Sequence, residues 1–371
     1  MDLDLTPEQE LVRRSAREFV DREIAPHVRE WDRGETMDRG IVAKLAEIGF
    51  LAGWELDTVS YCLVMEELGR ADSSVRGIVS VNVGLVGKTI KRWGTEQQQR
   101  EWLPQLASGE ALGCYALTEP GAGSDPGSIS TRAERDGDAW TISGSKIFIT
   151  LGTWAGLALV FARTGEKITC FLVPTDAEGF STHQLKGKLG LRAQDTGELT
   201  LDGVRVPSDN VLGEVDGGMK VALSALDNGR ISLAAGCVGI AQGCLEASLA
   251  YAKERRQFGR SIASFQLVQE LLAEIAVETE AARLLTWRAA LAADSGARHT
   301  LESSIAKYYA SEAAVRAANA AVQVHGGYGY VDEYPVGKYL RDARVTTLYE
   351  GTSQIQKLII GRALTDVSAF N

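Results

Sequence analysis

The 371-residue chain has little proline, few histidines and no long uninterrupted apolar run. Its eight prolines are unevenly spread: two precede residue 104, five lie within 104–207, and only Pro335 follows. Because proline breaks helix interiors, the residues after 207 can form long helices more easily than the middle of the chain. The proline distribution therefore predicts helices, then strands, then helices, in two to three domains of about 150 residues each.

The shortage of basic residues and of apolar runs excludes several classes of function. The 39 Lys and Arg against 49 Asp and Glu give a net charge of -10, the opposite of the basic footprint of a nucleic-acid-binding protein. No apolar run approaches the roughly 18 residues of a membrane span. The N-terminal residues lack the basic-then-apolar order of a secretory signal, so none is expected.

The five cysteines and four histidines are scattered along the chain. No Cys-x-x-Cys pair and no metal-ligand spacing of histidines occurs, so neither a disulfide framework nor a metal site is expected. Cys237 and Cys244 could share one helix face, and we interpret them as small buried residues. A reducing, cytoplasmic compartment is the simplest expectation.

Helical patterns dominate both ends of the chain. Thr6 can cap a first helix and Pro7 suits its first turn. After Gly217-Gly218, apolar side chains return at three- and four-residue steps, a spacing that is typical of long bundle helices. Helices are predicted at 6–30, 41–50, 56–68, 74–92, 97–106, 218–254, 265–287, 299–324 and 351–364.

The segment after Gly109 has a different pattern, with short β-rich runs separated by turn signals such as Asp136-Gly137 and Ser143-Gly144. Several short strands within one segment indicate a small barrel or sandwich. Strands are predicted at 113–117, 130–134, 139–143, 146–150, 157–163, 168–173 and 197–201.

Five segments carry residue types that are suited to chemistry, at 117–125, 146–150, 255–260, 323–329 and 342–354. Glycines in the first and fourth allow a ligand to approach the backbone closely. Three arginines in the third could bind phosphates through two hydrogen bonds each. Each segment also has a purely structural interpretation, as a turn, a hydrophobic strand, a basic helix end, a helix terminus or a charged loop.

Individual side chains within these segments could serve a flat ligand or an acid–base step. Thr118 and Ser124 supply hydroxyl groups in the same segment as Gly121 and Gly123. Phe148 and Thr150 fall on one face of a strand and could present a ring and a hydroxyl to the same ligand. A carboxylate such as Glu350, in a mostly apolar cleft, would have a raised pKa and could act as a base.

Taken in this order, the five segments resemble the acyl-CoA dehydrogenase family, and the similarity runs from about residue 5 to 365. The stretches 115–125 and 341–356 both look like family signatures. The resemblance implies an α+β, mostly α, fold in three parts. These would be an N-terminal helical domain at 1–110, a middle β-barrel or sandwich domain at 111–215, and a C-terminal four-helix bundle at 216–371.

The resemblance also assigns roles to single residues, with FAD as the cofactor and no metal. Glu350 matches the catalytic base, which removes the α-proton of a thioester while the β-hydride moves to flavin N5. The residues that match FAD contacts are Leu117, Thr118, Phe148, Thr150, Arg255, Phe258, Gln323, Gly327, Thr352 and Gln354. Those that match acyl-CoA contacts are Ser124, Asp227, Arg230, Tyr349, Gly351 and Arg362.

The implied activity is the dehydrogenation of an acyl-CoA to the trans-2-enoyl-CoA, as in β-oxidation. Electrons would pass to electron-transfer flavoprotein. Arg255 and Phe258 would reach the FAD of a neighbouring subunit, which implies a homotetramer. The run 226–231 is most similar to short-chain and short-branched-chain members. An oxidase and a dehydrogenase of carrier-protein thioesters are alternatives on the same fold, whereas intact Glu350 argues against a scaffold without activity.

One branch of the family places its base immediately before the residue that matches Arg230. This chain has Gly229 there, which cannot act as a base, so the common arrangement with Glu350 is favoured. Two other features depart from the family pattern. The Asn that usually follows the residue matching Thr150 is Leu151 here, which alters hydrogen bonding beside the flavin. About ten residues of a Pro-Glu-x-Tyr-Gly-Gly type loop are absent near Gly53. Either the loop is deleted or the sequence omits it, and omission is favoured because a cut would remove a connection between two helices.

Overall fold

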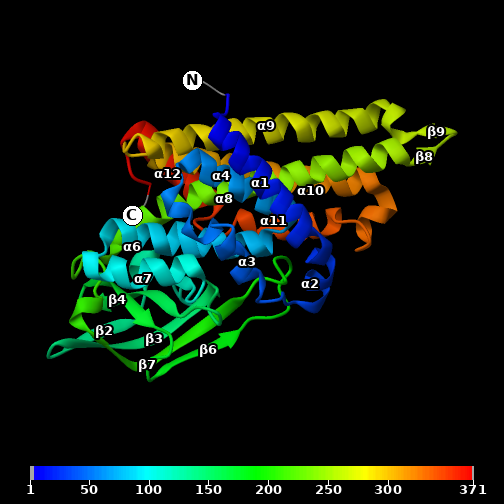
Figure 1. The fold of residues 1–371 in the computed structure, drawn as a ribbon. Helices are drawn as coiled ribbons and strands as arrows, with labels where there is room; N and C mark the ends of the chain where they lie inside the picture. Colours follow the sequence, from blue (N-terminus) through cyan, green and yellow to red (C-terminus); the bar gives the residue numbers. More distant parts are fainter. Residues whose placement is uncertain (1–3, 370–371) are drawn as a thin grey trace.

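Helices occupy both ends of the chain and strands the middle, as the proline distribution predicts (Figure 1). The computed structural model describes residues 4–369. In Figure 1 the strands of the large sheet lie at the lower left, helices α6 and α7 lie directly above them, and the longest helices cross the top of the molecule. The three-part arrangement expected from the sequence, with a helical part, a β part and a second helical part, is confirmed. We propose that the N-terminal helical domain comprises residues 1–110, the middle β domain 111–215 and the C-terminal helical domain 216–371.

The first predicted helix is divided in two. Thr6 caps α1 and forms a capping box with Gln9, as its sequence position suggests. The helix ends at Glu23, and a 3-10 turn containing Pro26 leads into α2, so the prediction of one helix over 6–30 was wrong. The helices of this part are α1 Pro7–Glu23, α2 Val28–Gly34, α3 Ile41–Glu47, α4 Thr58–Ala71, α5 Ser73–Val79, α6 Lys88–Trp93 and α7 Glu96–Ser108.

The apolar segment predicted as one helix at 74–92 also contains a break in its hydrogen-bond pattern. A π-helical stretch, Ser80–Gly87, lies between α5 and α6, and all eight of its residues are buried. Stretches of this kind are frequent at functional sites. Three of its residues, Ser80, Val81 and Leu85, face the cavity described below.

The strands form one seven-stranded sheet in the order β1-β4-β2-β3-β7-β6, with β5 paired to β4. The two strands predicted around Ser143-Gly144 are a single strand with irregular register, since Gly144 adopts a φ of 153° rather than turning the chain. The sheet strands are β1 Gly113–Ala116, β2 Arg132–Asp136, β3 Ala139–Thr150, β4 Leu157–Thr164, β5 Lys167–Pro174, β6 Phe180–Gln184 and β7 Thr196–Pro207.

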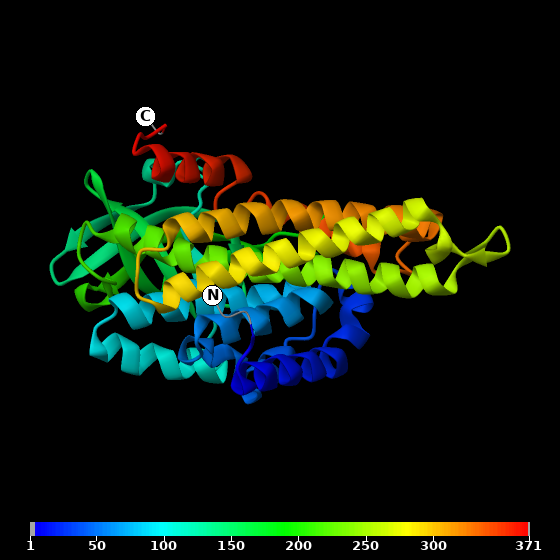
Figure 2. The same ribbon diagram turned by 90° about the horizontal axis from the view of Figure 1, so that it is seen from above.

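The C-terminal helices are long and pack side by side, which Figure 2 shows from above. A hairpin of two short strands joins α8 to α9 at one end of this bundle. Helix α11, which the sequence did not predict, follows α10 and leads to the loop with Glu350. The elements are α8 Gly218–Glu254, β8 Arg256–Gln257, β9 Arg260–Ser261, α9 Gln266–Asp294, α10 Thr300–His325, α11 Val336–Thr346 and α12 Ser353–Thr365.

Helix α8 is the one helix of residues 4–369 that is long and apolar enough to cross a membrane by length and composition. Its most apolar window is 67% buried inside the structure. A core helix passes the same test, and the packing of α8 against α4, α9 and α10 accounts for its apolar side chains.

The connection near Gly53 closes without the residues expected to be missing. A 3-10 helix, Phe50–Glu55, spans it, and Asp57 then caps α4 by accepting from the Ser60 N–H at 2.9 Å. Trp54 is buried in this connection, and its ring fills the space beside Gly87 so closely that a Cβ there would be 2.3 Å away. The short connection is therefore a packed part of the core.

Helices α4 and α8 approach so closely that only glycine fits between them. A Cβ on Gly69 would lie 2.4 Å from the carbonyl oxygen of Gly236. We expect Gly69→Ala to lower the free energy of unfolding by about 3 kcal/mol, because the two helix backbones must separate. Gly361→Ala is the matched control, since that helical position has open space. Urea unfolding measures both, and equal effects would contradict the packing argument.

Candidate active site

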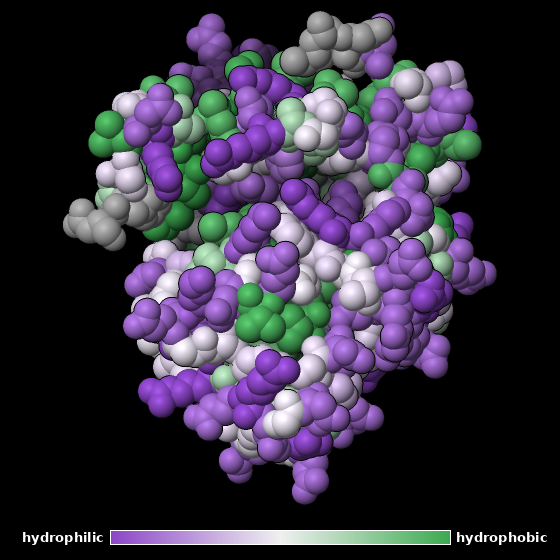
Figure 3. All heavy atoms as spheres, turned by 90° about the vertical axis from the view of Figure 1, so that its left-hand side faces the viewer, coloured by the Kyte–Doolittle hydropathy of each residue, from purple (hydrophilic) through white to green (hydrophobic). Residues whose placement is uncertain are grey.

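A cavity of about 1250 Å³ lies where the sheet, α5, α8 and α12 meet. Figure 3 shows the left-hand end of Figure 1, where hydrophilic side chains cover most of the surface. The cavity brings together most of the residues that the sequence singled out. Those in its wall are Leu117, Thr118, Ser124, Phe148, Thr150, Asp227, Arg230, Tyr349, Glu350, Gly351 and Arg362.

Glu350 lies in the loop between α11 and α12, and neighbouring groups fix its backbone. Its φ of 55° is in the left-handed region, which is unusual for a residue other than glycine and is often found at functional sites. Lys307 Nζ donates to the Gly351 carbonyl at 2.8 Å, and Gln356 Nε2 donates to the Glu350 carbonyl at 3.1 Å. These contacts turn the Glu350 side chain toward α8.

The Glu350 carboxyl group is well suited to exchange a proton near neutral pH. Its Oε2 is buried and has no hydrogen-bond partner within residues 4–369. Burial raises the pKa of Glu350 to about 7, and the positive charges of Arg76, Lys307 and Arg230 offset only part of that effect. A base whose pKa lies near the working pH is the most effective kind.

Gly229 on α8 lies directly beneath this carboxyl group. A Cβ at Gly229 would be 2.3 Å from Glu350 Oε2 and 2.7 Å from Leu85 Cδ2. Any side chain at this position would displace one of them. The site therefore holds its carboxylate at Glu350, and the position before Arg230 serves only to make room for it.

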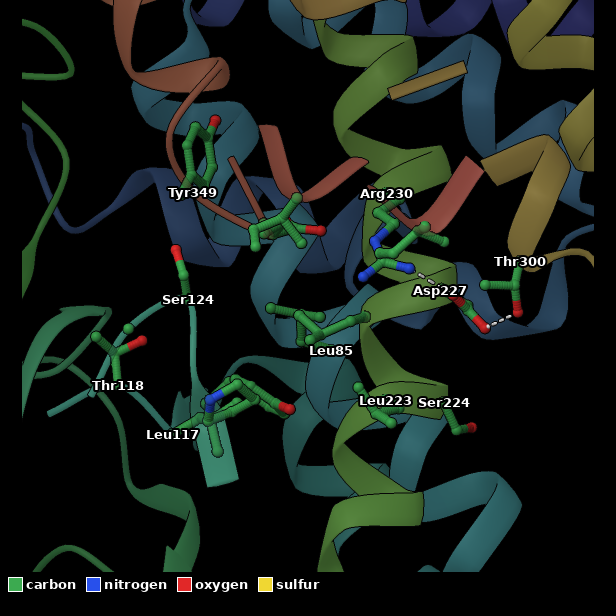
Figure 4. A pocket seen from close by; sticks show the side chains of 18 of the residues that line it. Leu85, Leu117, Thr118, Ser124, Leu223, Ser224, Asp227, Arg230, Thr300 and Tyr349 are labelled. Carbon is green, nitrogen blue, oxygen red and sulfur yellow. Dashed lines mark hydrogen bonds and ion pairs between the residues drawn. The ribbon is translucent and has the colours of Figure 1, made fainter. Parts of the chain in front are cut away.

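A polar chain runs along α8 beside the cavity (Figure 4). Arg230 Nη1 donates to Asp227 Oδ1 at 2.7 Å, and Thr300 Oγ1 donates to Asp227 Oδ2 at 2.7 Å. Arg230 is buried, and burial lowers its pKa although Asp227 favours its charged form. This ion pair places a fixed cation in the cavity wall near Glu350.

The segment with Leu117 and Thr118 is anchored by the buried Lys146, to which the sequence analysis assigned no role. Lys146 Nζ donates to the Leu117 carbonyl at 3.1 Å, to Glu119 Oε1 at 2.8 Å and to the Phe161 carbonyl at 2.7 Å. Burial lowers the pKa of Lys146 to about 8. A lysine at the start of the apolar run Ile147-Phe148 was the signal available in the sequence.

Glu119 completes this anchor. It accepts hydrogen bonds from the backbone N–H groups of Ser130 and Thr131 as well as from Lys146. Although burial opposes ionisation, these hydrogen bonds hold the pKa of Glu119 at about 2. The glutamate of the 117–125 segment is thus a structural anion rather than a base.

Phe148 projects into the cavity from an irregular part of β3. The β3–β7 register shifts between Lys146 and Ile149, and Phe148 adopts a φ of 59°. Phe148 is 68% exposed and lies in a wall that also contains Thr150. A large ring left uncovered on the wall of a cavity is a ready stacking surface for a flat ligand.

Leu151, which replaces the usual Asn, does not reach the cavity. Its side chain is completely buried, and its φ is 63°. Asn tolerates this left-handed conformation better than Leu does. The backbone N–H of Leu151 nevertheless donates to the Asp195 carbonyl at 3.1 Å, so the strand end is still fixed beside Thr150.

Four predicted residues lie at the other end of the bundle. Arg255, Gln323 and Gly327 border a second depression of about 470 Å³, where the Arg255 guanidinium lies over the Tyr328 ring. Phe258, at the tip of the β8–β9 hairpin, is 92% exposed. The cavity meets α8 between Leu223 and Arg230, and Arg255 follows Arg230 by 25 residues, a rise of about 38 Å along a helix. These residues therefore cannot serve the Glu350 cavity of the same chain.

The last two predicted residues begin α12. The Thr352 hydroxyl caps the helix by accepting from the Ile355 N–H at 3.2 Å, and Gln354 is exposed on the first turn. Neither residue borders the cavity, although Ile355 and Ile359 of the same helix do.

Two more buried cations of the site were missed by the sequence analysis. Arg76 and Lys307 both lie close enough to Glu350 to influence its pKa. Arg76 lies within an otherwise apolar helical run, and Lys307 follows Ala306 in an alanine-rich helix. A single charge within an apolar helical pattern was the only signal for either residue.

The residues present fit a large flavin cofactor. The uncovered Phe148 ring offers a stacking surface, the Thr150 hydroxyl lies in the same wall, and the cavity is large enough for a planar group as well as an acyl chain. No group of three or more His, Cys, Asp or Glu side chains that could hold a metal ion occurs in the described part of the chain.

Comparison with protein families gives three matches in chain order. The family models described as acyl-CoA dehydrogenase N-terminal, middle and C-terminal domains match residues 6–110, 114–204 and 216–365. Together the three matches span nearly the whole chain.

Curated relatives share about two fifths of the sequence. The probable acyl-CoA dehydrogenase YngJ of Bacillus subtilis is 43% identical, covering 98% of this chain and 100% of its own length. The short-chain specific acyl-CoA dehydrogenase of Clostridium acetobutylicum is 40% identical, covering 97% of this chain and 98% of its own length.

Solved structures superpose closely on the whole chain. Butyryl-CoA dehydrogenase from Megasphaera elsdenii has a TM-score of 0.96 at 37% identity and covers 98% of this chain and 100% of its own. A glutaryl-CoA dehydrogenase from Mycobacterium smegmatis in complex with FADH2 has a TM-score of 0.96 at 35% identity, with coverages of 99% and 97%. A chain from a study of the electron transferring flavoprotein of Acidaminococcus fermentans has a TM-score of 0.97 at 38% identity, with coverages of 99% and 100%.

Proposed function

The chain belongs to the acyl-CoA dehydrogenase family of FAD-dependent oxidoreductases, and on this basis we propose that it oxidises a short-chain acyl-CoA to the trans-2-enoyl-CoA with Glu350 as the base. The observation that carries the assignment is the Glu350 carboxyl group, which has a pKa of about 7 and an unpaired Oε2 and borders the same cavity as the other predicted site residues. The names of the short-chain and butyryl-CoA relatives support a short acyl chain.

The chain's own residues would do three things during the reaction. Glu350 Oε2 would receive the α-proton of the thioester. The backbone N–H of Glu350 would donate to the thioester carbonyl and lower the pKa of that proton. The cavity wall that includes buried Leu85 and Leu117 and half-buried Tyr349 would exclude water and keep the carboxylate basic. Bound FAD supplies the acceptor for the β-hydride.

We propose the following contacts for FAD and for the acyl-CoA. Leu117, Thr118, Phe148 and Thr150 would contact the flavin, and Thr352 and Gln354 its adenosine part. The acyl-CoA would contact Ser124, Asp227, Arg230, Tyr349, Gly351 and Arg362. The separation of about 38 Å along α8 between Arg230 and Arg255 supports the proposal that Arg255, Phe258, Gln323 and Gly327 reach the FAD of another subunit in a homotetramer.

Electron-transfer flavoprotein is the proposed acceptor, supported by the neighbour from the Acidaminococcus fermentans study. Turnover in air without an added acceptor distinguishes this proposal from an oxidase, which would release peroxide. We propose a cytoplasmic location, because all five cysteines are free and buried, as suits a reducing compartment.

Anaerobic titration of the purified, FAD-loaded protein with acyl-CoAs of increasing length tests the proposed function. Loss of the visible flavin absorbance upon addition of a short-chain acyl-CoA is the expected result, and the extent of bleaching ranks the chain lengths. A protein that binds no flavin, or whose flavin no acyl-CoA reduces, would contradict the proposal.

The pH dependence of the reaction should follow the ionisation of Glu350. Because only the carboxylate accepts a proton and its pKa is about 7, kcat/KM should rise about tenfold per pH unit below 7 and level off above it. Stopped-flow measurement of flavin bleaching between pH 5 and about 9 gives the profile. A profile that is flat through neutrality would show that another group takes the proton.

A further inference from the structure

Arg76 is a buried positive charge that the proposed mechanism does not use. It lies on α5, it is 2% exposed, and it contributes to the cavity wall beside Tyr349 and Glu350. Its Nη2 donates to the Tyr349 hydroxyl at 2.8 Å. Its Nη1 is buried without a hydrogen-bond partner, and the guanidinium forms no salt bridge with any carboxylate of residues 4–369.

The fold accommodates this side chain specifically. A Cβ on Gly236 of α8 would lie 2.2 Å from Arg76 Cδ and 2.8 Å from its Nε, so the arginine stem occupies the space that this glycine leaves. Ser80, four residues further along the same helical segment, also borders the cavity. The guanidinium is therefore fixed between α8 and the loop that carries the base.

The other two cations near Glu350 already have partners for their charged groups, whereas Arg76 has none for its Nη1 within the described residues. Arg230 forms an ion pair with Asp227, and Lys307 donates to the Gly351 carbonyl. Lys307 can also lose its charge, because burial lowers its pKa to about 8. An arginine cannot be deprotonated in this way, so Arg76 remains a permanent charge with an unused donor.

A charge in this position destabilises the folded chain unless something pairs with it. Burying an unpaired ion, or leaving a charged donor unsatisfied, costs free energy that a simple apolar side chain would not. A site for an unsubstituted fatty acyl chain needs only apolar walls. A carboxylate that arrives with the substrate would satisfy Nη1 and neutralise the guanidinium in a single step.

We propose that Arg76 binds a carboxylate at the far end of the acyl group, so that the preferred substrates are CoA thioesters of short dicarboxylic acids. This inference rests on the proposed function and refines its substrate class. Tyr349 connects the two ends of the site, because its hydroxyl accepts from Arg76 and it immediately precedes Glu350. An acyl chain whose α-carbon lies at Glu350 would place its terminal group at Arg76.

Binding of such a carboxylate would also affect the base. Among the groups that favour the charged form of Glu350, Arg76 has the largest influence. Neutralising Arg76 with the substrate's own anion raises the pKa of Glu350. The substrate that fits would thus make the base stronger when it is bound.

A purely structural role for Arg76, holding Tyr349 in place, makes a different prediction. In that case, replacing Arg76 would lower the reaction of every acyl-CoA by a similar factor. A carboxylate site instead predicts a change in the ratio between charged and neutral substrates. The ratio is therefore the quantity to measure.

The experiment compares the FAD-loaded enzyme on matched thioesters of four to six carbons: succinyl-, glutaryl- and adipyl-CoA against butyryl-, pentanoyl- and hexanoyl-CoA. We expect at least one dicarboxylic member to have a kcat/KM about tenfold or more above that of its neutral partner. In Arg76→Met that ratio should fall by about 100-fold, since a charge-assisted pair is lost. Arg76→Lys should recover part of the preference.

Two controls keep the outcomes distinct. Flavin content and melting temperature show whether each variant folds, and calorimetric binding of glutaryl-CoA to Glu350→Gln measures affinity without turnover. Neutral acyl-CoAs that reduce the flavin while no dicarboxylic thioester is preferred would overturn this inference and leave the proposed function standing. If no acyl-CoA of either kind reduces the flavin, the proposed function itself fails.

Discussion

Replacing Glu350 with Gln should lower the rate of substrate-dependent flavin bleaching by about 10⁴-fold, the upper end of the range for general base catalysis. The amide has the same shape but cannot accept the α-proton. The large factor follows from the surroundings, because Asp227 of the same cavity wall is already paired with Arg230, and Asp125 and Asp366 lie in other segments of that wall. Single-turnover stopped-flow measurement under anaerobic conditions isolates this step.

The matched control is Glu350→Asp, which keeps the carboxylate on a side chain one methylene shorter. It should retain more activity than Glu350→Gln, because its carboxylate can still accept the α-proton although it lies farther from the substrate. Equal flavin content in both variants shows that the cavity is intact. Near-normal bleaching by Glu350→Gln would mean that the proton goes elsewhere, and the assignment of the base would fall.

Replacing Lys146 with Met should destabilise the protein by about 3–5 kcal/mol, the usual cost of breaking a buried ion pair. The Lys146 and Glu119 side chains are 0% and 3% exposed, so water cannot replace the missing partner. The Leu117 carbonyl also loses its Nζ donor, and we therefore expect weaker FAD retention. Urea unfolding and flavin content after gel filtration measure the two effects.

Lys167→Met is the comparison, because Lys167 is an exposed lysine on a strand of the same sheet. It should change stability by less than about 0.5 kcal/mol. The double variant Lys146→Met/Glu119→Gln should recover part of the loss, since it leaves no unpaired charge. Equal losses of unfolding free energy in Lys146→Met and Lys167→Met would show that the buried Lys146–Glu119 ion pair does not stabilise the fold.

The pattern of helices could be predicted from sequence because side-chain periodicity and capping residues act locally. Thr6 and Thr95 both cap helices near their predicted starts. Elements that depend on distant partners were missed. Strand β6 is mostly exposed, with no apolar alternation to reveal it, and it is held by pairing with β7. Ser143-Gly144 looked like a turn, but the neighbouring strand keeps it extended as part of β3.

In the site, too, residues that belong to local motifs could be predicted, whereas residues that depend on distant contacts could not. Eleven residues identified by motif lie in one cavity, because a motif records chemistry at fixed spacing. Arg76 and Lys307 lie outside the five candidate segments, and Lys146 begins one of them but was given no role there. What makes all three important is burial, which depends on the whole fold. In the sequence, a charge inside an apolar run is as compatible with an exposed helix face as with a buried cation.

The packing of Gly229 against the Glu350 carboxyl also constrains how such a site can change over evolutionary time. A lineage that moved its base to α8 by first acquiring a glutamate at 229 would displace the glutamate it already relies on, since even a Cβ there would be 2.3 Å from Oε2. Clearing position 350 first leaves no base at all. Either order passes through an impaired enzyme, so relocation is easier in a duplicated gene that selection has temporarily released.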